Sequence, residues 1–248
     1  MLKFVKRPNL PENAVGVVLS CQAVKKLART LSARHIRIYP SCVLPQPLRG
    51  LAAHPDTQLT HLKDNLWIAS KSAYSYYEKL FCGSGIKLVQ GRQTGVGNYP
   101  KDAAYNVAWV GRFAFHHFCL TDQKLLSLMK AERVEVRQGY GKCSVCIVDE
   151  NSIITEDRSI ARAAQNRGLA VLEISKGSVA LEGMEYGFLG GASGKLAKNL
   201  LAFAGNIKTH TDYGAIYRFC KARNVELLSL CDERLMDIGS ILPIFEEE

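Results

Sequence analysis

The chain has 248 residues, 47% hydrophobic and 22% charged, which is enough for one large domain with its own core. No apolar run approaches the ~18 residues of a membrane span, and Pro8, Pro11 and Glu12 interrupt the one stretch that resembles a signal peptide. We therefore expect a cytoplasmic protein that does not bind membranes.

The net charge of +9 comes from Lys and Arg residues that are scattered and not interleaved with aromatics. This pattern favours an ordinary soluble surface or an anionic small ligand over nucleic acid, which stays the less favoured partner. The eight cysteines lie mostly inside apolar segments, as reduced, buried cysteines do.

Strand–helix–strand patterns recur along the whole chain. Amphipathic periodicity predicts five helices, at 21–35, 71–82, 121–133, 157–168 and 211–224. A strand is expected before each helix, at 15–20, 65–69, 112–118, 152–155 and 206–209. Another is expected after each, at 36–39, 86–90, 134–138, 170–174 and 225–230. Four of the units have a further strand in front, at 58–62, 104–110, 144–148 and 186–190.

The first unit lacks that further strand, while the stretch 238–245 is a strand left without a unit. If the last strand completes the first unit, the array closes and leaves no exposed sheet edge. The prediction is an α/β fold of one domain, a five-bladed ββαβ propeller with pseudo-fivefold symmetry. Its approximate units are 14–56, 57–102, 103–143, 144–185 and 186–237, with 238–245 as closing strand. A doubly wound parallel sheet is the alternative, and the extra strand per unit argues against it.

A polar or reactive residue stands in a Gly- or Pro-rich turn before each inner strand. These residues recur about every 45 positions along the chain. They are Asp56 with its neighbour His54, Asp102, Cys143, Glu185 and Asp237. In a ring of five units such positions converge on the axis, and His, Cys and carboxylates together are the groups that nucleophilic catalysis uses.

Four stretches, 54–69, 101–107, 141–145 and 181–188, resemble the penteins, or guanidino-group-modifying enzymes. The resemblance implies that His54 opens the strand of the catalytic histidine, and that Cys143 is the nucleophile. It implies that Asp102 and Asn106 lie on a substrate-binding strand, and that Glu182 and Glu185 supply carboxylates. The chain is similar to dimethylarginine hydrolases and to arginine and agmatine deiminases. Its nucleophile lies mid-chain instead of near the C-terminus, so the match requires circular permutation.

The chemistry of a guanidinium group fits these residue types. Carboxylates such as Glu185 and Asp237 would bind it by paired, charge-assisted hydrogen bonds. Cys143 would attack the central carbon, and His54 would protonate the leaving amine and then activate water. Asp56 would orient His54 if the turn is extended. The expected activity is that of a hydrolase or transferase on linear amidines, with no cofactor and no metal.

Less specialised interpretations remain open for the same residues. Cys143 can be a buried strand cysteine, and Cys143 with Cys146 forms only a weak redox or zinc motif. His54 can be a turn residue before Pro55. The pair His116–His117 is expected on a strand surface.

The alternative function is a non-catalytic pentein that binds a ribosomal, RNA or protein partner, or a small ligand, at the axis. In that case Cys143 would be unreactive, and the central acids would be paired with Lys142 or Arg side chains. If the substrate is an amino acid, a cationic side chain must bind its carboxylate, and the sequence does not distinguish among Arg92, Arg112 and Lys142 for this role. The sequence leaves the substrate and the oligomeric state undetermined.

Overall fold

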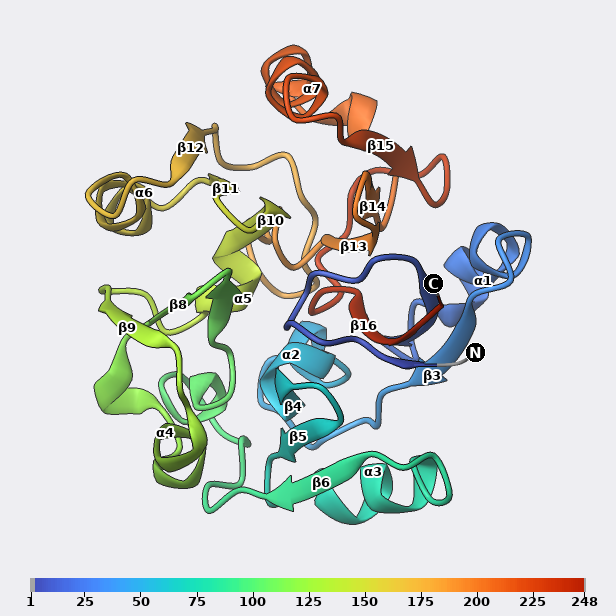
Figure 1. The fold of residues 1–248 in the computed structure, drawn as a ribbon, viewed down its shortest axis with the longest axis vertical. Coiled ribbons are helices and arrows are strands. Elements are labelled where there is room, and N and C mark those ends of the chain that lie inside the picture. Colours follow the sequence, from blue (N-terminus) through green and yellow to red (C-terminus); the bar gives the residue numbers. More distant parts are fainter. Residues whose placement is uncertain (1–2, 248) are drawn as a thin grey trace.

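The computed structural model describes residues 3–247, and these residues form five small sheets around a common centre (Figure 1). One sheet has four strands, in the order β1 (Lys3–Phe4), β16 (Leu242–Glu246), β2 (Ala14–Leu19) and β3 (Arg37–Pro40). Two three-stranded sheets are β4 (Leu59–Lys63), β5 (Leu66–Ala69), β6 (Lys87–Gln90), and β7 (Ala108–Val110), β8 (Phe113–His116), β9 (Glu132–Glu135). The other two are β10 (Val145–Asp149), β11 (Ser152–Thr155), β12 (Ala170–Glu173), and β13 (Ser193–Ala197), β14 (Leu200–Phe203), β15 (Glu226–Ser229).

All five sheets share one connection pattern. The middle strand runs antiparallel to the inner strand and parallel to the outer one. A helix joins the middle and outer strands and lies on the outside in Figure 1. These helices are α1 (Val24–Ser32), α3 (Tyr74–Leu80), α4 (Gln123–Leu128), α6 (Arg158–Gln165) and α7 (Tyr213–Lys221). The five helices expected from the sequence are therefore present, each shorter than predicted.

The C-terminal strand completes the first unit. Strand β16 pairs antiparallel with β2, with Leu242 opposite Val18. This pairing was expected, because the first unit lacked an inner strand of its own. Each of five core clusters joins the apolar stripe of one helix to residues of its own sheet and of the neighbouring sheet. Among residues 3–247, no helix has the length and hydrophobicity that a membrane span needs.

The predicted inner and middle strands of the fifth unit are wrong, whereas its outer strand, expected at 225–230, is present as β15. Residues 186–190 form no strand, and Ile207–Thr209 forms a 3₁₀ turn, η4, whose cap is the Asn206 side chain, accepting from the Lys208 N–H at 3.0 Å. The true strands are β13 and β14, between the two predicted ones. Glycines at 187, 190, 191 and 194 break the side-chain alternation on which the prediction relied.

Two turns at the centre are short helices, α2 (Pro55–Gln58) and α5 (Gly141–Ser144). The expectation that 54–56 is extended is therefore wrong, as is the assignment of Cys143 to a strand. Pro55 has the backbone φ that a first helical residue needs and lacks the N–H that would otherwise go unpaired there. Both helices direct their first-turn side chains toward the centre of the molecule.

Candidate active site

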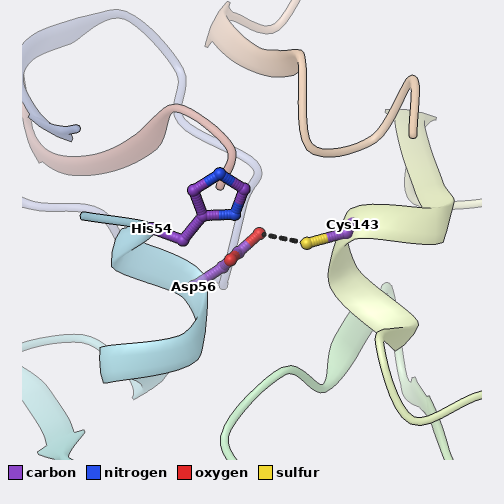
Figure 2. A group of neighbouring side chains, drawn as sticks. All are labelled: His54, Asp56 and Cys143. Carbon is purple, nitrogen blue, oxygen red and sulfur yellow. Dashed lines mark hydrogen bonds between the residues drawn. The ribbon is translucent and has the colours of Figure 1, made fainter. Parts of the chain in front are cut away.

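Three reactive side chains meet at the centre, on α2 and α5. Polar atoms of His54, Asp56 and Cys143 all lie within 4.8 Å of one another, and all three residues are buried. The Cys143 thiol donates to Asp56 Oδ2, with Sγ and the oxygen 3.1 Å apart (Figure 2). Residues far apart in the sequence are thus brought into one site, and the turn pattern predicted their convergence.

Asn106 holds Cys143 through two hydrogen bonds. Its Nδ2 donates to Sγ at 3.2 Å, and its Oδ1 accepts from the Cys143 backbone N–H at 3.0 Å. Burial raises the pKa of the Cys143 thiol well above its ordinary value, and the nearby Asp56 and Asp237 raise it further. The resting thiol is therefore protonated, and it needs a cation nearby before it can become a nucleophile.

A buried ammonium group lies on the other side of Asp56. Lys142 Nζ donates to Ser240 Oγ at 2.9 Å, and Ser240 Oγ lies 2.7 Å from Asp56 Oδ2, to which it can donate. Burial lowers the pKa of Lys142, against the attraction of Asp56. Burial raises the pKa of Asp56, against the attraction of His54 and Lys142. The sequence left Lys142 open as a partner of a substrate carboxylate or, in a non-catalytic protein, of the central acids, and it did not identify Ser240, which bridges Lys142 to Asp56.

Asp237 and His54 face each other, with Oδ1 and Nδ1 3.8 Å apart. Backbone N–H groups of Phe188 and Gly239 donate to the Asp237 carboxylate at 2.9 and 3.1 Å. Burial nevertheless raises the Asp237 pKa to about 6. Burial also lowers the pKa of His54, so its imidazole is neutral at neutral pH. Within residues 3–247 neither His54 ring nitrogen has a hydrogen-bond partner, although both are buried and His54 lines a cavity.

Two adjoining cavities reach this cluster. One, of about 730 Å³, is lined by Cys143 and Asp237; the other, of about 1170 Å³, by His54 and Asp237. Glu185 lines both and is exposed, and exposed Glu182 lines the larger one. The structure therefore places the two glutamates at the mouth, apart from the buried acids.

Asp102 lies outside the central cluster. Its Oδ2 accepts from the Tyr140 hydroxyl at 2.7 Å, and Tyr140 lines the smaller cavity. Asp102 thus fixes a wall residue of the cavity. Arg92 and Arg112 are exposed and line neither cavity.

Gly191 allows the Asp237 carboxylate to approach the backbone. A Cβ at this position would lie 2.0 Å from Asp237 Oδ1. We expect Gly191→Ala to lower the free energy of unfolding by about 1–3 kcal/mol, as overpacking a core does. Urea unfolding measures this loss. The control is Gly214→Ala in α7, where the nearest atom is 3.5 Å away and alanine favours the helix. Equal stabilities for the two variants would contradict the packing at Asp237.

The same three central side chains could also hold a metal ion. One ligand atom each from His54, Asp56 and Cys143 lies within 4.8 Å of the others, a donor set that suits Zn²⁺. An ion held there would occupy the sulfur and block its use as a nucleophile.

Comparisons with known proteins identify relatives of the fold. The model of a family described as "Family of unknown function (DUF6873)" matches residues 18–242. No curated protein matches the sequence. Solved structures do match. An inosamine-phosphate amidinotransferase from Streptomyces griseus has a TM-score of 0.60 and 10% identity, covering 98% of this chain and 97% of that one.

Two further solved structures are similar to this chain. Agmatine deiminase from C. jejuni has a TM-score of 0.58 and 12% identity, covering 93% of this chain and 91% of that one. An amidinotransferase of saxitoxin biosynthesis from Microseira wollei has a TM-score of 0.55 and 11% identity, covering 92% and 91%. These likenesses confirm the predicted resemblance to the penteins at the level of the fold.

Proposed function

Since the chain belongs to DUF6873, a family of unknown function, we propose its function from the site: a cysteine-dependent hydrolase or transferase acting on a guanidino or amidino group. The observation that carries this proposal is the contact of the Cys143 thiol with Asp56 beside His54, at cavities that Asp237 also lines. The fold supports it, because its solved relatives include deiminases and amidinotransferases.

The buried acids would bind the substrate. A guanidinium is planar and cationic, and it would donate paired hydrogen bonds to the Asp237 and Asp56 carboxylates. Its positive charge would favour the thiolate of Cys143, opposing the effect of burial. The larger cavity would take the remainder of the substrate past Glu182 and Glu185.

His54 would move the protons. Neutral in the resting site, it accepts the thiol proton as Cys143 Sγ forms a bond to the central carbon. It then gives that proton to the leaving nitrogen, and the C–N bond breaks to leave a thiouronium on Cys143. Water, or an acceptor amine, loses a proton to His54 and attacks this adduct. The C–S bond then breaks, and the departing Cys143 thiolate takes the proton back from His54.

A second function is favoured by a different contact. Asp56 is linked to Lys142 through Ser240, so one central acid already has an internal cation. A non-catalytic pentein that binds a small ligand, or a ribosomal, RNA or protein partner, would have its acids paired in this way. In that case Cys143 would stay protonated and unreactive.

Two finer features of the fold, closure of the ring and circular permutation of its units, are also part of the proposal. The pairing of β16 with β2 supports a ring closed about a pseudo-fivefold axis. The mid-chain position of Cys143 supports a circularly permuted unit order. A circular permutant joined at the present termini and opened between β3 and β4 should fold if the ring is closed. Its thermal unfolding midpoint measures this, and failure of every such permutant to fold would contradict closure.

A thermal-shift panel tests the proposed function. Arginine, agmatine, methylarginines and creatine-like compounds are screened against the wild type and against Asp237→Asn, which removes a central carboxylate charge. We expect at least one compound to raise the wild-type Tm while the variant stays unchanged. A panel without any shift, or shifts that Asp237→Asn preserves, would contradict recognition of a guanidino group at this site.

Binding should depend on pH through Asp237. Only the ionised carboxylate attracts a cation, and burial raises the Asp237 pKa to about 6. The Kd of a guanidinium ligand should therefore rise roughly tenfold per pH unit below 6 and level off above it. Calorimetric titration between pH 5 and 8 measures this dependence. A Kd that stays constant from pH 5 to 7 would show that Asp237 does not pair with the ligand.

A further inference from the structure

A second cysteine has a histidine and a carboxylate arranged around it, and none of the three residues lines the central cavities. Cys119 lies on the 3₁₀ turn η3 (Phe118–Leu120), which directly follows β8. Its sulfur is 3.1 Å from His117 Nε2, and His117 Nδ1 is 2.6 Å from Glu135 Oε1 on β9. The sequence predicted a surface pair at 116–117. This is wrong for His116, which is buried, and it holds for His117.

The carboxylate fixes the orientation of the imidazole. Glu135 Oε2 also accepts from the Phe118 backbone N–H at 3.2 Å, so both of its oxygens are engaged. With Nδ1–H donating to Glu135, the His117 tautomer leaves Nε2 free to accept the Cys119 thiol proton. Thiol, imidazole and carboxylate therefore stand in the order used by cysteine nucleophiles.

Access distinguishes this thiol from the central one. Cys119 is exposed, and the side chains of His117 and Glu135 are also open to solvent, at 39% and 59%. Cys143, by contrast, is buried. An exposed thiol next to a proton acceptor is the setting in which cysteines react with soft electrophiles.

We propose that Cys119, His117 and Glu135 form a modification site for thiol–disulfide exchange with small-molecule disulfides. His117 Nε2 takes the thiol proton, and Cys119 Sγ attacks one sulfur of the disulfide. The new S–S bond forms as the old one breaks, and the departing thiolate takes the proton back from His117. One disulfide and one thiol give one mixed disulfide and one small thiol, so no further oxidant is needed.

Cys82 supplies a control within the same molecule. It is also exposed, and within residues 3–247 its sulfur makes no hydrogen bond. The rate at which Cys82 reacts with the disulfide therefore measures the reactivity that exposure alone gives a thiol. Any excess reactivity of Cys119 is attributable to His117 and Glu135.

The test uses the full chain and glutathione disulfide at pH 7, with the modified fraction of each cysteine read from peptide masses over time. We expect Cys119 to react about tenfold faster than Cys82. His117→Gln should reduce the Cys119 rate to that of Cys82, and Glu135→Gln should reduce it several-fold. The Cys82 rate should stay constant in both variants, and the buried Cys220 should stay unmodified, which verifies that they remain folded.

Two results would overturn the proposal. Equal rates at Cys119 and Cys82 in the wild type would show that exposure alone governs both thiols. A Cys119 rate unchanged in both variants would show that His117 and Glu135 do not activate it. Neither result depends on the function of the central cavity.

Discussion

Replacing Cys143 by alanine is expected to lower kcat by about 10⁴-fold or more on any guanidino compound that the wild type turns over. The reason is that the variant has no sulfur to form the covalent intermediate, and loss of a nucleophile has effects of this size. Binding should persist, because Asp56 and Asp237 remain. Measuring turnover and ligand-induced thermal shift on the same preparation distinguishes loss of catalysis from loss of binding.

Cys146→Ala is the matched control for this experiment. Cys146 is buried on β10 and belongs to the core cluster beside α7, away from the His54 cavity. Its replacement should cost some stability and leave kcat unchanged. Turnover retained by Cys143→Ala, or lost equally in both variants, would refute the assignment of Cys143 as nucleophile.

Lys142→Met is expected to lower the free energy of unfolding by about 3–5 kcal/mol at pH 7. The substitution leaves the buried Asp56 carboxylate without its internal cation, and an uncompensated buried charge has a cost of this order. Burial already raises the Asp56 pKa, and loss of Lys142 should raise it further. Urea denaturation with linear extrapolation measures the change.

A double-mutant cycle tests whether Lys142 and Asp56 act as a pair. Asp56→Asn removes the carboxylate charge, so the double variant has neither member of the pair. We expect it to be more stable than the sum of the single losses implies, with a coupling of about 1–3 kcal/mol through Ser240. Strictly additive losses would show that the Lys142–Ser240–Asp56 contacts do not link the two charges.

Sequence patterns predicted the parts of the fold with strong periodicity. The five outer helices were predictable because each has an apolar stripe. Two of them, α4 and α6, also have an N-cap side chain, such as Asp157, whose carboxylate accepts from the Ser159 and Ile160 N–H groups. The pairing of the C-terminal strand was predictable from the count of strands per unit. The inner and middle strands of the fifth unit were not, because glycines between 187 and 194 remove the side chains that periodicity requires.

The regular spacing of polar residues along the chain, more than any single motif, predicted where the site lies. His54, Asp56, Cys143 and Asp237 were found because each lies in a turn before an inner strand, and the structure brings all four together. The same argument placed Glu185 at the axis, whereas it lies exposed at the cavity mouth. A residue's position in such a turn predicts that it lies at the same end of its sheet as the other turn residues. Whether its side chain is buried depends on tertiary packing, which the sequence pattern does not predict.

Lys142 and Ser240 show the other limit of sequence interpretation. The sequence left open whether Lys142 pairs with a substrate carboxylate or with the protein's own acids, because burial of an ammonium is costly unless it is paired with some anion. Its partners come from the turn after Asp237 and from α2, remote in sequence. The bridging role of Ser240 depends on tertiary structure, and no sequence pattern indicated it.

The most direct test of the central claim is the site of covalent labelling by 2-chloroacetamidine, a reactive amidine. After incubation with the intact protein, peptide masses locate the adduct. The account predicts rapid labelling of Cys143, slowed by a bound guanidino ligand and strongly reduced in Asp237→Asn. Labelling of the exposed Cys82 and Cys119 with Cys143 left unmodified would contradict it and favour a binding protein without turnover.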